Sequence, residues 1–388
     1  MRIALIAPTH IPARRANTIQ VMKMAQAMTA LGHDVLVLSP SEGSEQEREK
    51  PSWEALARHY GLKYQFALQW LSARPWLRRY DYGLIAIRRA HRWQADLIYT
   101  RLPQAAALAS LLGHKTIYEV HDLPQGSLGP QLFRLFLQRK GARRVVVITK
   151  ALRDDLFPAA KTPVEVVIAP DGVDLARYAD LPDPLEARLR LLARDTVPDA
   201  ISGLSPERFT LGYTGHLYAG RGVELILDIA RRLPAVQCLL VGGEPNQVSQ
   251  VRGQLRVEKM NNVFLTGFVP NAELPLYQAA SDALLMPYQH RVSASSGGDI
   301  AAYLSPMKLF EYMACGRPIL SSDLPVLGEI LNPENAVLLP SDDVDAWVST
   351  VQELHSSPDR CHALGDQARR DVRRYTWKAR SERILKDL

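Results

Sequence analysis

The chain has 388 residues, too many for one ordinary hydrophobic core and suited to two domains. Hydrophobic residues make up 47% and charged residues 23%, a balance typical of a globular protein, and no apolar run is long enough to span a bilayer. The net charge of +6 favours anionic partners such as phosphates, nucleotides or acidic lipids, without selecting one of them.

The first half of the chain alternates short apolar runs with helical patterns. This alternation predicts βαβ units and a parallel sheet. The predicted strands cover 3–7, 35–39, 97–100, 116–120, 145–149 and 166–169, and the predicted helices include 18–31, 104–111 and 150–157.

A polar, proline-containing stretch with one amphipathic helix over 185–193 then predicts a connection, after which the pattern restarts. Predicted strands cover 210–213, 237–241, 263–266, 283–286, 318–321 and 336–339, and predicted helices cover 223–233, 247–259, 273–280, 306–314 and 344–356, before an arginine-rich helical tail. We expect two doubly wound, Rossmann-like α/β domains facing a cleft, because ligands of such sheets bind outside the carboxyl ends of the strands. The expected boundaries are 1–175, with a C-terminal helix at about 376–388 packed back on it, a connection at 176–208, and 209–375.

Several common enzyme classes lack their sequence motifs. Neither half has G-x-G-x-x-G after its first strand, which counts against a dinucleotide dehydrogenase. The chain also lacks G-x-x-x-x-G-K-S/T, G-x-S-x-G and H-E-x-x-H, so ATPase, hydrolase and zinc-peptidase interpretations lose their main support.

A glycine-rich turn, Thr214 to Gly222, follows the first strand of the second half and leads into a helix. Glycines let a backbone approach a ligand closely, and a helix N-terminus offers free N–H groups. Arg221 adds a planar charged fork suited to phosphate oxygens. The turn predicts a phosphate site rather than a plain glycine turn beside a solvated arginine.

The segment SPMKLFEYMACGRP, residues 305–318, has the features of a short buried helix. Ser305 can cap its start, Pro306 suits the first turn, and Gly316 suits a left-handed cap at the end. One acid, Glu311, interrupts the apolar residues. It either pairs with Lys308 on a wet face or points into a cleft and accepts hydrogen bonds from a ligand.

Four segments together resemble GT-B glycosyltransferases, in particular the large retaining family 4 (group 1). They are the glycine-rich turn, the helix segment, Tyr118-Glu119-Val120-His121-Asp122, and Ala169-Pro170-Asp171-Gly172-Val173-Asp174. The resemblance implies transfer of a hexose-type sugar from a nucleoside-diphosphate sugar to an acceptor hydroxyl, with retention at the anomeric carbon, in glycan or glycolipid synthesis. The first domain would bind the acceptor and the second the nucleotide sugar.

The resemblance also implies roles for single residues. Glu311 would bind the ribose hydroxyls, Arg221 would hold the diphosphate, and His121 would face the sugar near the reacting carbon, so these three carry the catalytic assignment. The nucleotide-sugar site would comprise Gly215, His216, Arg221, Gly267, Phe268, Val269, Tyr303, Ser305, Pro306, Met307, Lys308, Leu309 and Glu311. Arg15, Asn17 and Thr18, in the loop after the first strand, are candidates for acceptor contact, and a solvated loop is the alternative.

The chain departs from the family pattern at two positions. Tyr303 stands where the first glutamate of E-x7-E is common, and His216 stands where an arginine is common, so the donor sugar stays open and a non-catalytic binding protein remains an alternative. A GT-B sugar-nucleotide epimerase is another. No D-x-D motif of the metal-binding kind is present, and Arg221, Lys308 and the helix N-terminus could stabilise the leaving group. We therefore expect neither a cofactor nor a metal.

Further features of the sequence bear on the acceptor and the cellular location. Three scattered cysteines and an N-terminus, MRIALIAPTH, too short in apolar residues for a signal peptide, favour the cytoplasm. Residues 76–93 mix arginines with apolar residues, as in a helix on the inner face of an anionic membrane or an ordinary surface helix. The first alternative implies a lipid-linked acceptor. Nucleic acid is not expected, because stacking aromatics do not interleave with the basic residues. The glycine-containing stretch 289–302 suggests a lid, and a neutral insertion is the alternative.

Overall fold

The structure, a computed structural model, describes residues 1–41, 50–74, 77, 80–159, 162–194, 199–293 and 298–388. The chain forms two compact units. The first unit contains Met1–Asp171 together with Trp377–Leu388, and the second contains Gly172–Thr376. The last twelve residues thus return to the unit in which the chain begins.

The first unit is built on a seven-stranded parallel sheet with the order β3-β2-β1-β4-β5-β6-β7. Its central strands are buried along their whole length, as expected of a parallel sheet covered on both faces. The strands are β1 (Arg2–Ile6), β2 (Asp34–Pro40), β3 (Ala67–Leu71), β4 (Leu97–Thr100), β5 (Thr116–Val120), β6 (Ala142–Val147) and β7 (Glu165–Ile168).

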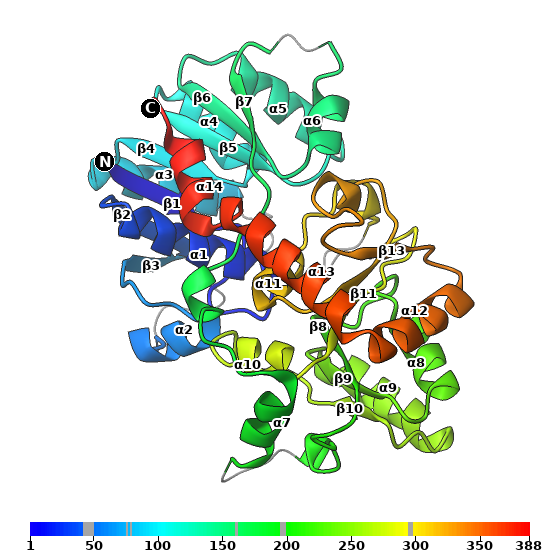
Figure 1. Cartoon of the computed structure of the whole chain (residues 1–388). Helices are drawn as coiled ribbons and strands as arrows, with labels where there is room; N and C mark the ends of the chain where they lie inside the picture. The colour runs from blue at the N-terminus through cyan, green and yellow to red at the C-terminus, as the bar shows by residue number, and fades with distance from the viewer. Residues whose placement is uncertain (42–49, 75–76, 78–79, 160–161, 195–198, 294–297) are drawn as a thin grey trace. The chain divides into compact units, whose positions relative to one another are not determined.

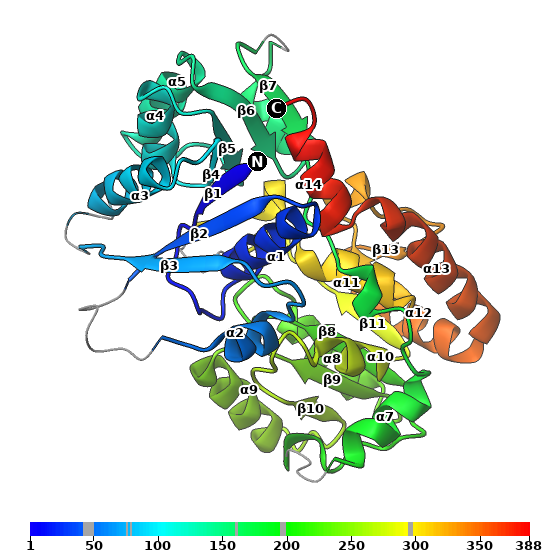
Figure 2. The same ribbon diagram turned by 90° about the vertical axis from the view of Figure 1, so that its left-hand side faces the viewer.

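Helices α3 and α4 cover part of the sheet through a shared apolar core, in which Tyr82 and Ala86 of α3 lie with Ala105 of α4 and Ile98 of β4. The chain's last helix, α14, packs beside α1, as both views show (Figures 1 and 2). The helices of this unit are α1 (Ala16–Ala30), α2 (Trp53–Tyr60), α3 (Tyr80–Arg92), α4 (Pro103–Leu111), α5 (Gly129–Leu137), α6 (Lys150–Leu156) and α14 (Trp377–Leu385).

The second unit has a six-stranded parallel sheet with the order β10-β9-β8-β11-β12-β13. Its strands are β8 (Thr210–Thr214), β9 (Gln237–Val241), β10 (Val263–Leu265), β11 (Ala283–Met286), β12 (Ile319–Ser322) and β13 (Val337–Leu339). The fold class predicted from the sequence, two doubly wound α/β domains, is confirmed.

Two apolar cores lie on the two faces of this second sheet. Neighbouring residues of β9 divide between them, Leu239 in one core and Leu240 in the other, because successive side chains of a strand point to opposite faces. The helices are α7 (Pro184–Leu192), α8 (Val223–Arg232), α9 (Pro245–Val257), α10 (Leu274–Ala279), α11 (Met307–Cys315), α12 (Val344–Ser356) and α13 (Pro358–Asp371).

The predicted connection at 176–208 is part of the second unit rather than a separate linker. Helix α7 packs against α10, and Ala187, Leu191 and Ile201 are fully buried in the core. Arg188 donates to the carboxylate of Asp282 at 2.8 Å, which anchors the segment further. The sequence did not predict these buried positions, because the stretch is mostly polar.

The helix expected within 76–93 is α3, and its apolar residues Tyr82, Ala86, Ile87 and Ala90 pack into the unit's core. Residues 75–76 and 78–79, which include part of the predicted basic segment, lie outside the described residues, as do 294–297 of the expected lid. Among the helices that the structure describes, none is both long and apolar enough to cross a membrane.

Candidate functional site

The glycine-rich turn of the second unit joins β8 to α8. Gly220 and Gly222 have φ angles of +80° and +79°, and a Cβ on either would lie 1.9 Å from the carbonyl oxygen of Arg291 or Pro287, respectively. Both positions require glycine because the 287–292 segment lies against them, and only glycine adopts such angles freely. The close approach predicted for a ligand is thus made, at these two positions, by the protein's own backbone.

Two cations lie at this turn beside tyrosine rings. The Lys308 ammonium lies 3.8 Å from the ring centroid of Tyr213 and 5.2 Å from that of Tyr288. Arg221 donates through Nη1 to the Tyr288 hydroxyl at 3.1 Å. Strands β8 and β11, which precede Gly215 and Tyr288, are neighbours where the strand order reverses, the usual ligand position in such sheets.

Part of the hydrogen-bonding capacity of these cations is unused. Lys308 Nζ and Arg221 Nε are buried and have no hydrogen-bond partner within the described part of the chain. Burial lowers the pKa of Lys308 well below its usual range, and the nearby Arg221 lowers it further. An anion bound here would pair with both Lys308 and Arg221 and would offset the repulsion between their positive charges.

Glu311 lies on α11 and is 9% exposed, which excludes a pair on a wet face. Its Oε2 accepts a hydrogen bond from Gln278 Nε2 at 3.2 Å, and the same amide lies 3.3 Å from Thr214 Oγ1 at the end of β8. The amide oxygen of Gln278 accepts from the Tyr178 hydroxyl at 2.9 Å. Gln278 therefore holds Glu311 near the end of β8 through Oε2, and the other carboxylate oxygen, Oε1, takes no part in this hydrogen bond.

Helix α11 differs in one detail from the sequence prediction. Its N-cap residue is Pro306, with φ −75° and ψ 128°, rather than Ser305, and the Pro306 side chain makes no capping hydrogen bond. The predicted left-handed cap at Gly316 is present, with φ 69°. In the first turn, Leu309 N donates to the carbonyl of Pro306 at 2.9 Å.

The other residues predicted for the nucleotide sugar occupy varied environments. The His216 ring stacks on Tyr218 with centroids 4.7 Å apart, and its Nδ1 lies 3.8 Å from Glu244 Oε1. Tyr303 is buried at the end of a short 3₁₀ helix, Ala301–Tyr303.

Several of the remaining predicted residues serve local structure. Gly267, at φ +78°, accepts a hydrogen bond from Gly242 N at 2.8 Å. Val269 packs against the core, and Leu309 is buried within it. Ser305, Met307 and Phe268 are partly exposed.

In the first unit, His121 follows β5. Its Nε2 lies 2.5 Å from Oε1 of the fully buried Glu119. Burial, aided by Arg101, lowers the pKa of His121 to about 4, so the ring is neutral at neutral pH. A cavity of about 230 Å³ lies beside it, lined among others by Arg101, Asp122 and Gln125.

The predicted acceptor-side residues surround the start of α1. Arg15 is exposed. Asn17 donates to Thr9 Oγ1 at 2.7 Å, and its own Oδ1 is buried without a partner among the described residues. Thr18 is fully buried and donates to the carbonyls of Ala13 and Arg15, so it shapes the loop.

Sequence reasoning missed the residues that hold the predicted ones in place. Glu119 could have been found, because residues two apart on a strand share a face and so place it beside His121. Gln278, Tyr213 and Tyr288 lie on separate elements and gave no motif. Among the described residues, no three or more His, Cys, Asp or Glu side chains form a group that could hold a metal ion.

Two sequence profiles of known families match the chain. One, described as "Glycosyl transferases group 1", matches residues 208–357, and the other, described as "Glycosyltransferase Family 4", matches residues 18–177. The two matches thus divide between the two units of the structure.

Individual proteins are similar over most of their length. A GDP-mannose-dependent alpha-(1-6)-phosphatidylinositol monomannoside mannosyltransferase of Mycolicibacterium smegmatis is 24% identical, covering 80% of this chain and 87% of the relative. A phosphatidyl-myo-inositol mannosyltransferase of the same organism is 22% identical, covering 100% of this chain and 93% of the relative. Among solved structures, HepE of Anabaena in complex with UDP and glucose has a TM-score of 0.74 at 17% identity, with 100% of each chain covered.

The structural similarity shows that the two units have the GT-B fold. The profiles show that both units carry glycosyltransferase domains. The chain therefore belongs to the GT-B glycosyltransferases of group 1 and family 4.

Proposed function

We propose that this protein is a retaining, metal-independent hexosyltransferase, which moves a sugar from a nucleoside-diphosphate sugar to an acceptor hydroxyl in glycolipid synthesis. The observation that carries the proposal is the pair of buried cations, Lys308 and Arg221, whose nitrogens Nζ and Nε lack partners among the described residues. A diphosphate supplies the negative oxygens that such a pair needs.

The same cations supply the chemistry of the leaving group. Breaking the bond between the sugar and the diphosphate places negative charge on the departing oxygen. Fixed donors directed at that charge lower the barrier, and two cations can do what a divalent metal does in other transferases. The proposal of metal independence rests on these two groups.

Glu311 is the proposed ribose ligand. Gln278 holds its Oε2, and an ionised carboxylate can accept hydrogen bonds from two neighbouring hydroxyls. His121 is the proposed contact to the donor sugar. The solved HepE complex contains UDP and glucose, which supports a nucleoside diphosphate and a hexose as the donor's parts.

The acceptor proposal comes from the relatives' names. Two similar mannosyltransferases act on phosphatidylinositol compounds, which supports a lipid-linked hydroxyl as the acceptor. We propose that the protein works in the cytoplasm, where it meets this acceptor at an anionic membrane. The exposed Arg88 and Arg92 on α3, whose apolar residues face the core, are available for such contact.

The test is a transfer assay with GDP-mannose and UDP-glucose as donors and vesicles containing phosphatidylinositol as acceptor, with a chelator present. Replacing Arg221 in the variant Arg221→Met should lower kcat by roughly 10²- to 10³-fold, the usual cost of one donor to a developing charge. The matched control is Arg231→Met, since Arg231 pairs with Glu258 at an exposed position on α8. NMR of the product should show the anomeric configuration of the donor.

Three results would contradict the proposal. They are loss of turnover on addition of the chelator, inversion at the anomeric carbon, and equal activity of the Arg221→Met and Arg231→Met variants. Release of free sugar or an isomerised donor at the same rate with and without vesicles would show hydrolysis or epimerisation instead of transfer.

A further inference from the structure

The buried carboxylate of Glu119 collects hydrogen bonds from four parts of the first unit. Its Oε1 accepts from Gln20 Nε2 at 2.5 Å and from Arg380 Nη2 at 2.8 Å, and His121 Nε2 lies within hydrogen-bond distance of it at 2.5 Å. Its Oε2 accepts from the Tyr99 hydroxyl. The donors come from α1, the end of β5, β4 and α14.

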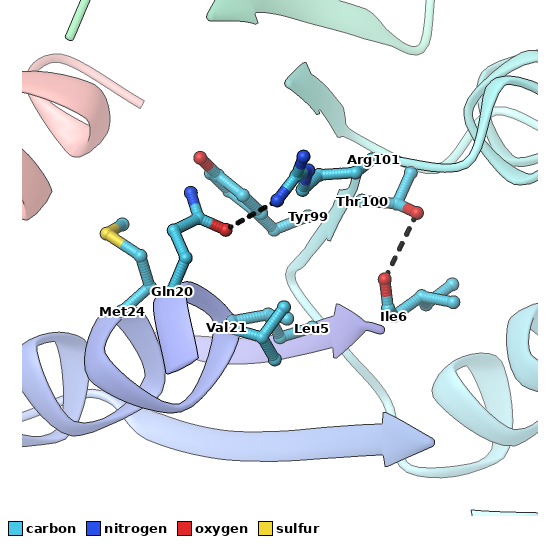
Figure 3. A pocket seen from close by; sticks show the side chains of 8 residues that line it. All are labelled: Leu5, Ile6, Gln20, Val21, Met24, Tyr99, Thr100 and Arg101. Carbon is cyan, nitrogen blue, oxygen red and sulfur yellow. Dashed lines mark hydrogen bonds between the residues drawn. The ribbon is translucent and has the colours of Figure 1, made fainter. Parts of the chain in front are cut away.

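The neighbourhood of this carboxylate is tightly packed. Gln20 on α1 and Arg101 after β4 point toward one another and are joined by a hydrogen bond of 3.3 Å (Figure 3). Tyr99 lies beside them in the same view. The charged groups that act on His121 are Glu119 on β5, Arg101 after β4 and Arg380 on α14. Tyr99 on β4 contacts Glu119, and Asp171 lies close to Arg380.

Among the residues that bond Glu119, Arg380 lies farthest away along the sequence, and several of its N–H groups donate hydrogen bonds. It is 3% exposed, and its Nε also donates to the carbonyls of Ala169 at 3.2 Å and Pro170 at 2.9 Å. Arg380 therefore links the Glu119 carboxylate to the backbone of Ala169 and Pro170, near the end of the segment Met1–Asp171. An arginine fork suits a carboxylate and two carbonyls better than the single ammonium of a lysine.

We propose that Arg380 and Glu119 are positioning residues that hold His121 as the tautomer with its proton on Nε2, so that Nδ1 faces the substrate as a hydrogen-bond acceptor. The proposal rests on the proposed function in that His121 contacts the donor sugar. It assigns a part of the site to α14, a helix that follows the whole second unit in the chain.

The tautomer follows from the partners of the ring. An ionised carboxylate only accepts hydrogen bonds, so the nitrogen that faces it, Nε2, carries the proton. The partly buried ring is neutral at neutral pH, which leaves Nδ1 with a lone pair. A neutral ring of this form can accept a proton or a hydrogen bond from a sugar hydroxyl but cannot donate through Nδ1.

Arg380 decides whether Glu119 is ionised. Burial alone would raise the pKa of Glu119. Arg380, as the largest of the opposing causes, holds it well below the usual range together with His121 and Arg101. Without the guanidinium, a protonated carboxyl would itself donate to Nε2, and the ring proton would have to move to Nδ1. Loss of Arg380 should thus reverse the hydrogen-bonding character of the nitrogen that faces the substrate.

The test is the tautomer of His121, read from its ring ¹⁵N shifts in the full-length protein at pH 7 and assigned by comparison with His121→Gln. The wild type should show a protonated Nε2 and an unprotonated Nδ1. Arg380→Met and Glu119→Gln should lose this single tautomer, and Arg380→Lys, which keeps the charge, should retain it in part. A wild-type spectrum with the proton on Nδ1, or an unchanged spectrum in folded Arg380→Met, would overturn the proposal.

A matched control separates positioning from the docking of α14. Arg144 donates to the carbonyl oxygens of Ile384 and Lys386, near the same helix's end, without touching Glu119. Arg144→Met should therefore loosen α14 and leave the tautomer of His121 unchanged. A change in the tautomer as large as that of Arg380→Met would show that any disturbance of α14 acts on the ring, against the proposal.

Kinetics provide a second readout. Glu119→Gln should lower kcat by roughly 10- to 100-fold, the cost measured for removing the carboxylate that orients a metal-bound histidine, with the KM for the donor within about twofold of wild type. Because the ring spectrum needs no turnover, a wild type without transferase activity but with the expected tautomer would contradict the proposed function and leave the positioning assignment standing.

Discussion

Each unit gathers buried charges near the carboxyl ends of its parallel strands, but the two groups are completed differently. In the first unit, Glu119 accepts from four side chains, and Arg380 is paired with that carboxylate and with backbone carbonyls. In the second unit, Lys308 Nζ and Arg221 Nε lack hydrogen-bond partners among the described residues. The difference indicates that burial alone does not identify a ligand site. Two neighbouring cations with unused hydrogen-bonding capacity are a stronger indication, whereas a cation already paired with a carboxylate and carbonyls serves to position its partners.

The largest effect is expected from removing Arg380 from the hydrogen-bond network around Glu119 in the first unit. Arg380→Met leaves the Glu119 carboxylate buried without its main cation, and breaking a buried pair in this way costs about 3–5 kcal/mol. We expect that loss in the free energy of unfolding, measured with urea on the first unit's transition. A loss below about 1 kcal/mol would show that the network is not held by this pair.

The second way to test the completed network uses pH. Unfolded His121 takes up a proton near its ordinary pKa of 6.5, while the folded ring does so only at about 4 because it is buried. Between these values the unfolded state binds more protons, so acidification favours unfolding, by up to roughly 3 kcal/mol. We expect the wild type to lose stability relative to His121→Gln as the pH falls from 6.5 to 4.

Asp171, a further titrating group beside the network, acts in the opposite direction. Burial raises the pKa of Asp171 to about 7, so its folded form binds more protons than its unfolded form between pH 4 and 7. That contribution is present in both proteins and largely cancels from their difference. Parallel stability curves for wild type and His121→Gln would show that the ring is accessible to protons in the folded state.

The degree of burial also decided which elements the sequence could predict. Buried strands such as β5 and β9 were predicted at their observed bounds, because a continuous apolar run between helices has few other interpretations. Edge strand β3 was missed, since its residues are only partly buried and its sequence, ALQWL, has no clear pattern. Helix α5 was also missed, as it begins with Gly129 and Pro130.

The candidate site divides in a similar manner. Lys308, Arg221 and Glu311 were predicted because local motifs carry them, and the structure places the first two together beside Tyr288. Arg380 had no comparable signal. It lies 261 positions from Glu119 in an arginine-rich tail, where nothing local separates a buried arginine from a solvated one.

Substitution of one of the two cations of the second unit, Lys308 and Arg221, should change the stability of the free protein far less than Arg380→Met does. Lys308→Met removes a cation whose buried Nζ forms no ion pair within the described part of the chain. The loss of its desolvated contact with Tyr213, worth about 2 kcal/mol, offsets the relief. We expect the free energy of unfolding to stay within about 1 kcal/mol of wild type.

The function of that cation should appear when a ligand is added. A nucleoside diphosphate at 100 times its Kd should stabilise the wild type by about 2.7 kcal/mol, and much less at the same concentration in Lys308→Met. Thermal unfolding with UDP and GDP, alone and in the variant, measures both quantities. If the substitution destabilised the free protein by several kcal/mol and left stabilisation by UDP and GDP intact, Lys308 would belong to the fold, as Arg380 does. The result expected here, a nearly unchanged free protein that no longer responds to the nucleotide, separates a charge kept for a ligand from one kept for its neighbours.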